Sequence, residues 1–431
     1  MSSEEQLIVT LDAPDLGPAR PVGVLTRHPG PRTAVAFAYA RSWLDHAEGF
    51  ALEPRLPLVE GPQYAPDGGL PSVLGDTTPD LWGRLLLERR EAVAANREGR
   101  RARRLSDWEF LVGVSDETRM GALRLRRGVD GPFIDDRDPS VPPITGLRAL
   151  EAAAQAFEAN RGEAIADSTI ALLITPGSSL GGGRPKANFH GLEGDLWIAK
   201  FPSRTDRQDS GAWEEVYARL ARAAGIEVAE TSLLRLGTHG RTFATRRFDR
   251  TDVGRMLFAS AMTMTGKQDG EPAGYPDLAK AVTDVVAHAA VRDDLEQLFR
   301  RLVFNILAGN RDDHLRNHGF LRRPEGWRLA PAFDMNPARE MREHSLAIDG
   351  SITEPNLAAA LATHRLYGLS EGQVREIVGQ VGQAVSTWAS VADSVGISTV
   401  EQETVGVVFQ TAFWSPLGVL SGDSESSIVV P

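Results

Sequence analysis

The stretch FNILAGNRDDHLRNHGFLRRPEGWRLAPAFDMNP, residues 304–337, decides how the rest of the chain is interpreted. Apolar residues at helical spacing lead into it and predict a helix over about 294–308. Gly309 follows the last residue of this apolar stripe and is expected to end the helix. After a polar segment, two short apolar runs at 319–321 and 327–330 predict strands around a turn. Polar residues therefore follow both the helix and the second strand, where loops can present them.

The spacing of these polar residues indicates phosphoryl transfer. Asp312 and Asn317 lie five positions apart, which is the spacing of the base and the metal-binding Asn in the catalytic loop of protein kinases. Asp334 follows the second strand and is placed to bind the metal ion that bridges the nucleotide phosphates. Asp313 would have the wrong spacing to Asn317, so Asp312 is the expected base.

Two other interpretations of this segment are open. His314 and His318 are at i and i+4, as in a helical zinc pair, but no Glu follows His314 and Gly319 would break such a helix. A solvated polar loop without chemistry is the other alternative, and this segment alone does not exclude it.

The composition is that of an ordinary globular protein with room for two to four domains. The chain has 431 residues, of which 42% are apolar and 24% are charged. Its net charge of −11 argues against non-specific nucleic-acid binding by the whole surface, but not against a local basic face. The absence of cysteine excludes disulfides and thiolate metal sites. An acidic start without an apolar segment, and no long apolar run, predict a cytoplasmic protein without a membrane span.

The N-terminal part is expected to be rich in β-structure. Runs at 7–11, 22–25 and 34–39 predict strands, and a run at 121–125 predicts the strand that closes this unit. Helices are expected from about residue 80 and after Ser106. The arginines between 89 and 104 form a basic run, which is either a solvated helix face or a surface for phosphate or a partner.

A glycine-rich segment and a lysine-bearing strand lie in the middle of the chain. The segment GSSLGGGRPK, residues 177–186, could bring bare backbone close to an anion, although a flexible turn is the alternative. The strand expected at 196–201 carries Lys200, and the helix expected at about 212–224 carries Glu214 and Glu215. In protein kinases such a lysine binds the α- and β-phosphates and a helix glutamate orients it. Strands at 233–236 and 241–248 would complete a nucleotide lobe that ends near a hinge at about 245–248. Helices follow from about 277, among them 374–391 and 400–413.

Together these motifs resemble the HipA family of bacterial serine/threonine kinases, the toxin components of type II toxin–antitoxin pairs. The segments that carry the resemblance are PVGVL at 21–25, PDLWGR at 79–84, SLGGGRPK at 179–186, IAKFP at 198–202, RFDR at 247–250, NRDDHLRN at 310–317 and AFDMNP at 332–337. The resemblance implies an α+β, protein-kinase-like bilobal fold with an extra β-rich N-terminal domain and an all-helical C-terminal lobe. The implied domains are 1–126, the nucleotide-binding lobe at 146–275 and the helical lobe at 276–421, with a flexible tail at 422–431.

The resemblance also implies a role for each site residue. Asp312 would be the catalytic base, His314 would buttress the catalytic loop, and Glu214 would orient Lys200. Asn317 and Asp334 would hold Mg²⁺. The residues expected around ATP belong to the glycine-rich loop, the lysines and the hinge: Ser179, Gly181, Gly182, Gly183, Lys186, Lys200 and Arg246.

Two of these positions carry further expectations. Arg246 stands where an acidic residue is common in the family, which affects the expected nucleotide affinity and adenine selectivity. Ser179, with Ser178 as the neighbouring alternative, stands where family members autophosphorylate.

Substrate and partners follow from the same resemblance. Family members phosphorylate aminoacyl-tRNA synthetases, the glutamyl or the tryptophanyl enzyme, which stalls translation. The expected partner is a HipB-like helix-turn-helix antitoxin, which binds operator DNA and would link this chain to it; no membrane partner is expected. The alternative is a catalytically silent, kinase-shaped co-repressor that acts only through that partner, and a small-molecule kinase is a third interpretation.

Overall fold

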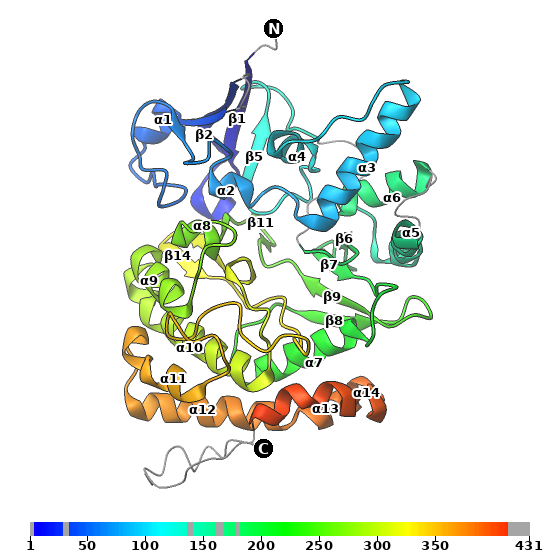
Figure 1. Cartoon of the computed structure of the whole chain (residues 1–431). Coiled ribbons are helices and arrows are strands. Elements are labelled where there is room, and N and C mark those ends of the chain that lie inside the picture. The colour runs from blue at the N-terminus through cyan, green and yellow to red at the C-terminus, as the bar shows by residue number, and fades with distance from the viewer. Residues whose placement is uncertain (1–3, 29–33, 136–140, 160–166, 178–181, 413–431) are drawn as a thin grey trace. The chain divides into compact units, whose positions relative to one another are not determined.

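The computed structural model describes residues 4–28, 34–135, 141–159, 167–177 and 182–412 (Figure 1). The chain forms two compact units, each assembled from separate stretches of sequence. Unit 1 contains Met1–Gly211, Ala229–Gln268 and Gly319–Ala330, and unit 2 contains Ala212–Val228, Asp269–His318 and Pro331–Pro431.

The first part of unit 1 is an antiparallel sheet in the order β4-β3-β2-β1-β5. Its strands are β1 (Glu5–Leu11), β2 (Arg20–His28), β3 (Ala34–Tyr39), β4 (Gln63–Tyr64) and β5 (Leu123–Arg126). The accompanying helices are α1 (Arg41–Leu44), α2 (Ser72–Gly75), α3 (Leu81–Arg97) and α4 (Asp107–Gly113). The predicted strands and the helices expected near residue 80 and after Ser106 are confirmed.

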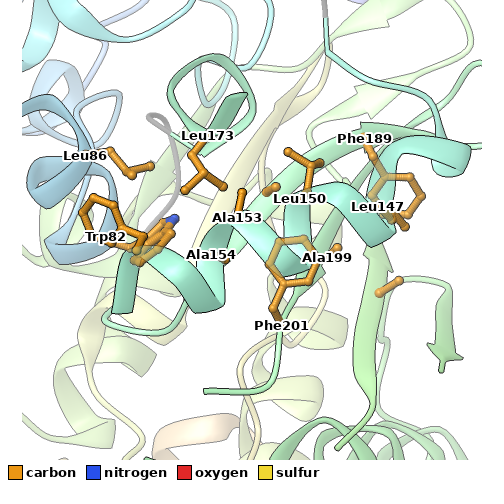
Figure 2. Packing of buried hydrophobic residues seen from close by; sticks show 13 residues of the cluster. Trp82, Leu86, Leu147, Leu150, Ala153, Ala154, Leu173, Phe189, Ala199 and Phe201 are labelled. Carbon is orange, nitrogen blue, oxygen red and sulfur yellow. The ribbon is translucent and has the colours of Figure 1, made fainter. Parts of the chain in front are cut away.

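A second antiparallel sheet in unit 1 has the order β6-β7-β9-β8. It consists of β6 (Lys186–His190), β7 (Leu196–Lys200), β8 (Thr231–Leu234) and β9 (Thr242–Arg246). Helices α5 (Leu147–Ala159) and α6 (Asp167–Gly177) pack with it. Figure 2 shows the shared apolar core, in which Trp82 and Leu86 of α3 lie with Leu173 of α6 and Phe201 beyond β7. Helix α3 therefore contributes to the core beneath the β6-β7-β9-β8 sheet, although it comes from the N-terminal part of the chain.

The remaining strands of unit 1 are short. Strands β12 (Phe258–Ser260), β13 (Gly319–Arg323) and β14 (Gly326–Leu329) form an antiparallel sheet, which confirms the strands predicted at 319–321 and 327–330. A hairpin of β10 (Arg250–Thr251) and β11 (Gly254–Arg255) precedes β12, and α8 (Ala261–Thr265) follows it.

Unit 2 is largely helical. Nearly all of α7 (Ser210–Ala223) belongs to it, and α9 (Tyr275–Val285) and α10 (Val291–Ala308) follow. Helices α11 (Leu357–Ala362), α12 (Glu371–Ser386), α13 (Trp388–Val395) and α14 (Thr399–Val405) come later in the chain (Figure 1). Helix α10 is the hub of the unit because it packs against both α9 and α12.

Two of the predicted helices are wrong in detail. The single helix expected at 374–391 is two helices that meet at Thr387, where the Thr387 and Ser386 hydroxyls donate to backbone carbonyls of the preceding turn. The helix expected at 400–413 ends at Val405 and continues as 3₁₀ turns over Gly406–Ala412. In the described residues, no helix is long and apolar enough to span a membrane.

Candidate active site

The catalytic-loop candidate in unit 2 begins where α10 ends. Gly309 adopts a left-handed conformation with φ of 68°, and its N–H donates to the Asn305 carbonyl. The next amide, that of Asn310, donates to the same carbonyl at 3.0 Å. The predicted helix end is confirmed, and this cap directs the chain away from the helix axis into the polar loop.

Within that loop the structure brings Asp312 and Asn317 together. The Asn317 side-chain amide donates to the Asp312 carbonyl at 3.0 Å, and the Asn317 N–H donates to the His314 carbonyl at 2.8 Å. Asn317 is buried, whereas Asp312 is exposed. The five-residue spacing therefore forms a closed loop that fixes Asn317 beside the backbone of Asp312.

The loop that carries Asp334 is tied to the catalytic-loop candidate. The Ala332 N–H donates to the Glu227 carbonyl at 2.7 Å, the Asn336 N–H donates to the Asn310 side chain at 3.4 Å, and the Ala338 N–H donates to the Gly309 carbonyl at 3.1 Å. Asp334 itself has φ of 59°, a left-handed conformation that few non-glycine residues adopt. Such conformations concentrate at functional sites because the surrounding structure must enforce them.

The charges of the two loops influence each other. Partial loss of hydration raises the pKa of Asp312 above its ordinary value; the charge of His314 lowers it, and the charges of Asp334 and Asp313 raise it further. Asp334 therefore lies close enough to Asp312 for the two carboxylates to repel one another. A carboxylate with a raised pKa is a better proton acceptor than an ordinary one.

A buried hydrogen-bond network lies beneath the catalytic-loop candidate, and the sequence did not reveal it. The Tyr275 hydroxyl and His318 Nε2 both hydrogen-bond the carboxylate of Asp313, the latter at 3.0 Å. The Asn305 amide donates to the Tyr275 hydroxyl at 2.8 Å, and the Asn310 amide donates to Asn305 at 3.0 Å. Burial would raise the pKa of Asp313, but His318 and the Tyr275 hydrogen bond hold it below its ordinary value. Asp313 is therefore a buried anion that anchors the loop.

Unit 2 also contains His314, which was expected to buttress the loop, and Asn317 and Asp334, which were expected to hold a metal ion. The Nδ1 atom of His314 is buried and has no hydrogen-bond partner in the described residues, so the buttressing role expected for His314 stays a prediction. Within the described ranges, no group of three or more His, Cys, Asp or Glu side chains is placed to hold a metal ion. Asn317 and Asp334 as an amide–carboxylate pair fall outside that pattern, and Mg²⁺ commonly takes only one or two protein carboxylates beside phosphate oxygens and water.

In unit 1 the lysines expected near ATP occupy neighbouring strand ends. Lys186 of β6 and Lys200 of β7 are directly opposite in the register, and Lys186 is buried. The Lys200 ammonium lies 5.9 Å from the centre of the Phe243 ring. Gly182 has φ of 73°, and a Cβ atom there would lie 2.8 Å from the Lys186 ammonium nitrogen. The described end of the glycine-rich segment therefore lies against these strand ends.

The other expected ATP-site residues are placed as follows. Ser178, Ser179 and Gly181 lie outside the described residues. Lys200 belongs to unit 1 and Glu214 to unit 2, so their pairing stays a prediction. Arg246 forms ion pairs with Asp195 at 3.1 Å and with Asp252 at 3.3 Å. Nearby carboxylates thus partly neutralise the positive charge of this hinge position.

The RFDR segment and the basic run have structural roles that the sequence did not separate. The buried carboxylate of Asp249 pairs with Arg247 and Arg250 at 2.6 Å each and accepts the Gly121 N–H at 2.7 Å, which joins the RFDR segment to the residues before β5. In the basic run, Arg100 and Arg103 both pair with Glu91. These two arginines therefore fix the segment after α3, and only part of the run can serve a partner.

Family models match most of the chain in two pieces. The HipA N-terminal domain matches residues 17–126, and the HipA-like C-terminal domain matches residues 178–388. The chain therefore belongs to the HipA family, and the resemblance inferred from its motifs is confirmed.

A solved structure of the family shows the same fold. The HipA of the Shewanella oneidensis MR-1 toxin–antitoxin system, solved with HipB and operator DNA, matches with a TM-score of 0.63 at 16% identity, over 96% of this chain and 97% of that one. The predicted α+β, HipA-like fold class is thereby confirmed. The Helicobacter pylori proinflammatory kinase CtkA matches with a TM-score of 0.42 at 17% identity, over 54% of this chain and 88% of that one.

A curated relative covers a smaller part of the chain. The Sinorhizobium fredii protein "Putative kinase Y4dM" is 31% identical over 161 residues, which are 33% of this chain and 37% of that protein. The match thus spans little more than a third of the relative's length.

Proposed function

We propose that the protein is an ATP- and magnesium-dependent serine/threonine protein kinase and the toxin of a toxin–antitoxin pair. The observation that carries the proposal is the pair of joined loops in unit 2. Asp312 and Asn317 lie in one loop and Asp334 lies in the other, and hydrogen bonds from the Asn336 and Ala338 N–H groups join the two loops. These residue types in this order are those of kinase catalytic and metal loops. Membership of the HipA family supports the same conclusion.

The residues fit a divalent cation. Asn317 and Asp334 offer the hard oxygen ligands that Mg²⁺ prefers. Loss of hydration is the main cause of the raised pKa of Asp312, and the charge of Asp334 adds to it. A positive ion near the two carboxylates would relieve their repulsion. When bound, the ion would neutralise charge on the nucleotide phosphates.

The remaining chemistry belongs to side chains of the chain. Asp312 would accept the proton of the attacking hydroxyl, and its raised pKa suits that role. Lys186, Lys200 and the glycine-rich segment would hold the phosphates, with Glu214 orienting Lys200. His318 and Tyr275 would keep Asp313, and through it the loop, in place.

The proposal extends to substrate, regulation and partner. The substrate would be a protein hydroxyl, in the family's manner that of an aminoacyl-tRNA synthetase. Ser179, or its neighbour Ser178, would be autophosphorylated, and the added charge would compete with the ATP phosphates for the loop. A HipB-like antitoxin would be the partner and would connect the chain to operator DNA; the Shewanella HipA was solved with HipB and operator DNA.

Phosphate transfer from Mg²⁺–ATP tests the proposal. Purified protein would be incubated with Mg²⁺–ATP and with glutamyl- and tryptophanyl-tRNA synthetase, and phosphate would be located by mass spectrometry. Asp312→Asn should lower the transfer rate by roughly 10²–10⁴-fold, since it removes the base. Asp284→Asn is the matched control, because Asp284 is an exposed residue of α9 in the same unit that pairs with Lys280.

The possible results are distinct. Transfer by the wild type and by Asp284→Asn, but not by Asp312→Asn, supports the kinase. Equal transfer by Asp312→Asn would exclude Asp312 as the base. A folded wild type that transfers no phosphate to itself or to either synthetase would favour the kinase-shaped co-repressor instead.

A further inference from the structure

The first turn of α3 is bonded to the exit of the glycine-rich segment, about a hundred residues further along the chain. The Gly182 N–H donates to Asp80 Oδ2 at 2.9 Å, and the Trp82 N–H donates to the Gly182 carbonyl at 3.0 Å. The Trp82 indole N–H donates to the Lys186 carbonyl at 2.9 Å. Three hydrogen bonds, one with the capping residue Asp80 and two from Trp82 of α3, therefore span the turn from Gly182 to Lys186.

The segment before this turn also lies against α3. A Cβ atom at Gly177, the last residue of α6, would lie 2.7 Å from Leu86 Cδ1 and 3.2 Å from the indole nitrogen of Trp82. Trp82 is fully buried and packs with Leu86 in the core that Figure 2 shows. Both described ends of the glycine-rich segment are thus positioned by one rigid helix.

Asp80 serves two partners with its two carboxylate oxygens. Oδ1 accepts the Leu81 N–H at 2.8 Å as the cap of α3, and Oδ2 accepts the Gly182 N–H. Both are hydrogen bonds to an ionised acceptor, which are stronger than neutral ones. The same carboxylate therefore begins the helix and holds the turn.

The turn positions the positively charged side chain of Lys186. Lys186 is the last residue of the turn, and its ammonium nitrogen lies 2.8 Å from where a Gly182 Cβ would be. Lys200 is its partner in the register of β6 and β7. A shift of the turn would move the Lys186 backbone and with it the spacing of these two cations at the sheet end.

We propose that Asp80 and Trp82 are positioning residues for nucleotide phosphates, which makes α3 of the N-terminal domain part of the nucleotide site. This inference rests on the proposed function, because it assigns the phosphates of ATP to the strand ends of unit 1. The N-terminal domain then acts on nucleotide affinity through the turn at Gly182, without contact to the ligand from Asp80 or Trp82.

Asp80→Asn tests the inference with little disturbance of the helix. Asn caps helices as well as Asp does. In Asp80→Asn, however, an NH₂ group replaces one of the two carboxylate oxygens, so one of the two N–H groups, that of Leu81 or that of Gly182, would face a donor and lose its acceptor. The control is Ser106→Ala, which removes the N-terminal cap of α4 in the same domain and leaves the turn untouched. Trp82→Phe is the second variant, since it keeps a ring in the core but loses the donor to Lys186.

Two quantities are compared on the full chain: the affinity for the magnesium complex of adenylyl imidodiphosphate, and hydrogen exchange at the Gly182 amide. The thermal midpoint of each variant is measured beside them as a report of stability. Asp80→Asn should bind the nucleotide analogue roughly tenfold more weakly and exchange the Gly182 amide faster, as expected for a lost charge-assisted hydrogen bond. Ser106→Ala should lower the thermal midpoint but change neither quantity. Trp82→Phe should also weaken binding of the analogue. If Trp82→Phe fails to fold, Asp80→Asn alone decides the test, because Asp80 is exposed and its replacement does not disturb the core.

The outcomes distinguish failure of this inference from failure of the proposed kinase function. If the wild type binds the analogue and Asp80→Asn binds it equally well, the inference is overturned and the proposed kinase is unaffected. If Ser106→Ala weakens binding as much as Asp80→Asn does, the effect belongs to domain stability and the inference is again overturned. A folded wild type that binds no magnesium nucleotide overturns the proposed function together with the inference.

Discussion

Replacing Tyr275 by phenylalanine would test the buried network beneath the catalytic-loop candidate. The Tyr275 hydroxyl donates to the Asp313 carboxylate and accepts the Asn305 amide N–H at 2.8 Å. Tyr275 is almost completely buried, so water cannot replace these partners in the variant. The Asp313 carboxylate would keep His318, but Asn305 would retain a buried donor without its acceptor.

The magnitude follows from the two lost hydrogen bonds. A hydrogen bond to a charged group contributes about 1.5–3 kcal/mol, and a neutral one contributes about 1 kcal/mol. Phenylalanine retains the ring packing, so the free energy of unfolding should fall by about 3 kcal/mol. Because Asp313 is adjacent to Asp312, kcat should fall roughly tenfold through misplacement of the base, with little change in KM for ATP.

Denaturant unfolding and steady-state phosphate transfer measure these two effects. Tyr367→Phe is the matched control, since Tyr367 is buried in the same unit and its hydroxyl makes no hydrogen bond in the described residues. If Tyr275→Phe destabilises the protein no more than Tyr367→Phe does, the network contributes nothing measurable and the reasoning fails.

The remaining predictions concern pH and have opposite signs. Burial lowers the pKa of His344 from 6.5 to about 4, so its contribution to stability is lost as the pH falls through that window, by about 3 kcal/mol. In His344→Asn the free energy of unfolding should depend less on pH between these values. A pH dependence equal to that of the wild type would show that His344 is not its cause. Burial raises the pKa of Glu53 from 4.5 to about 7, so its contribution is fully present below pH 4.5 and is lost as the pH rises towards 7. Glu53→Gln should remove that decline in denaturant midpoints measured across the same range, and an unchanged decline would show that Glu53 is not its source.

Local signals predicted much of the fold correctly. The apolar stripe before Gly309 predicted α10 because a helix with one buried face repeats its apolar positions. Gly309 ends the helix because a left-handed cap favours glycine. Asp312 and Asn317 could be paired because they lie in one short loop, where spacing alone constrains their distance.

Other elements gave no local signal. Helix α6 contains the run IALLI at 170–174, which is apolar throughout and therefore lacks the periodicity that separates a helix from a strand. Tyr275 contacts Asp313 from 38 positions away, and Asp80 contacts Gly182 from 102 positions away. No spacing rule predicts such pairs, because each depends on how packed elements bring distant loops together.

The structure distinguishes the adjacent residues Asp312 and Asp313, between which the sequence chose the catalytic base by spacing alone. Asp313 is buried, and His318 and Tyr275 hold its pKa below its ordinary value, so it is a weak proton acceptor that a substrate hydroxyl cannot easily reach. Asp312 is exposed at the surface, and its pKa is raised by partial loss of hydration and by the charges of Asp334 and Asp313. Neighbouring carboxylates whose pKa values are shifted in opposite directions have separate roles. Asp313 is therefore suited to anchor the loop and to make Asp312 more basic, and this division supports Asp312 as the proton acceptor independently of the five-residue spacing.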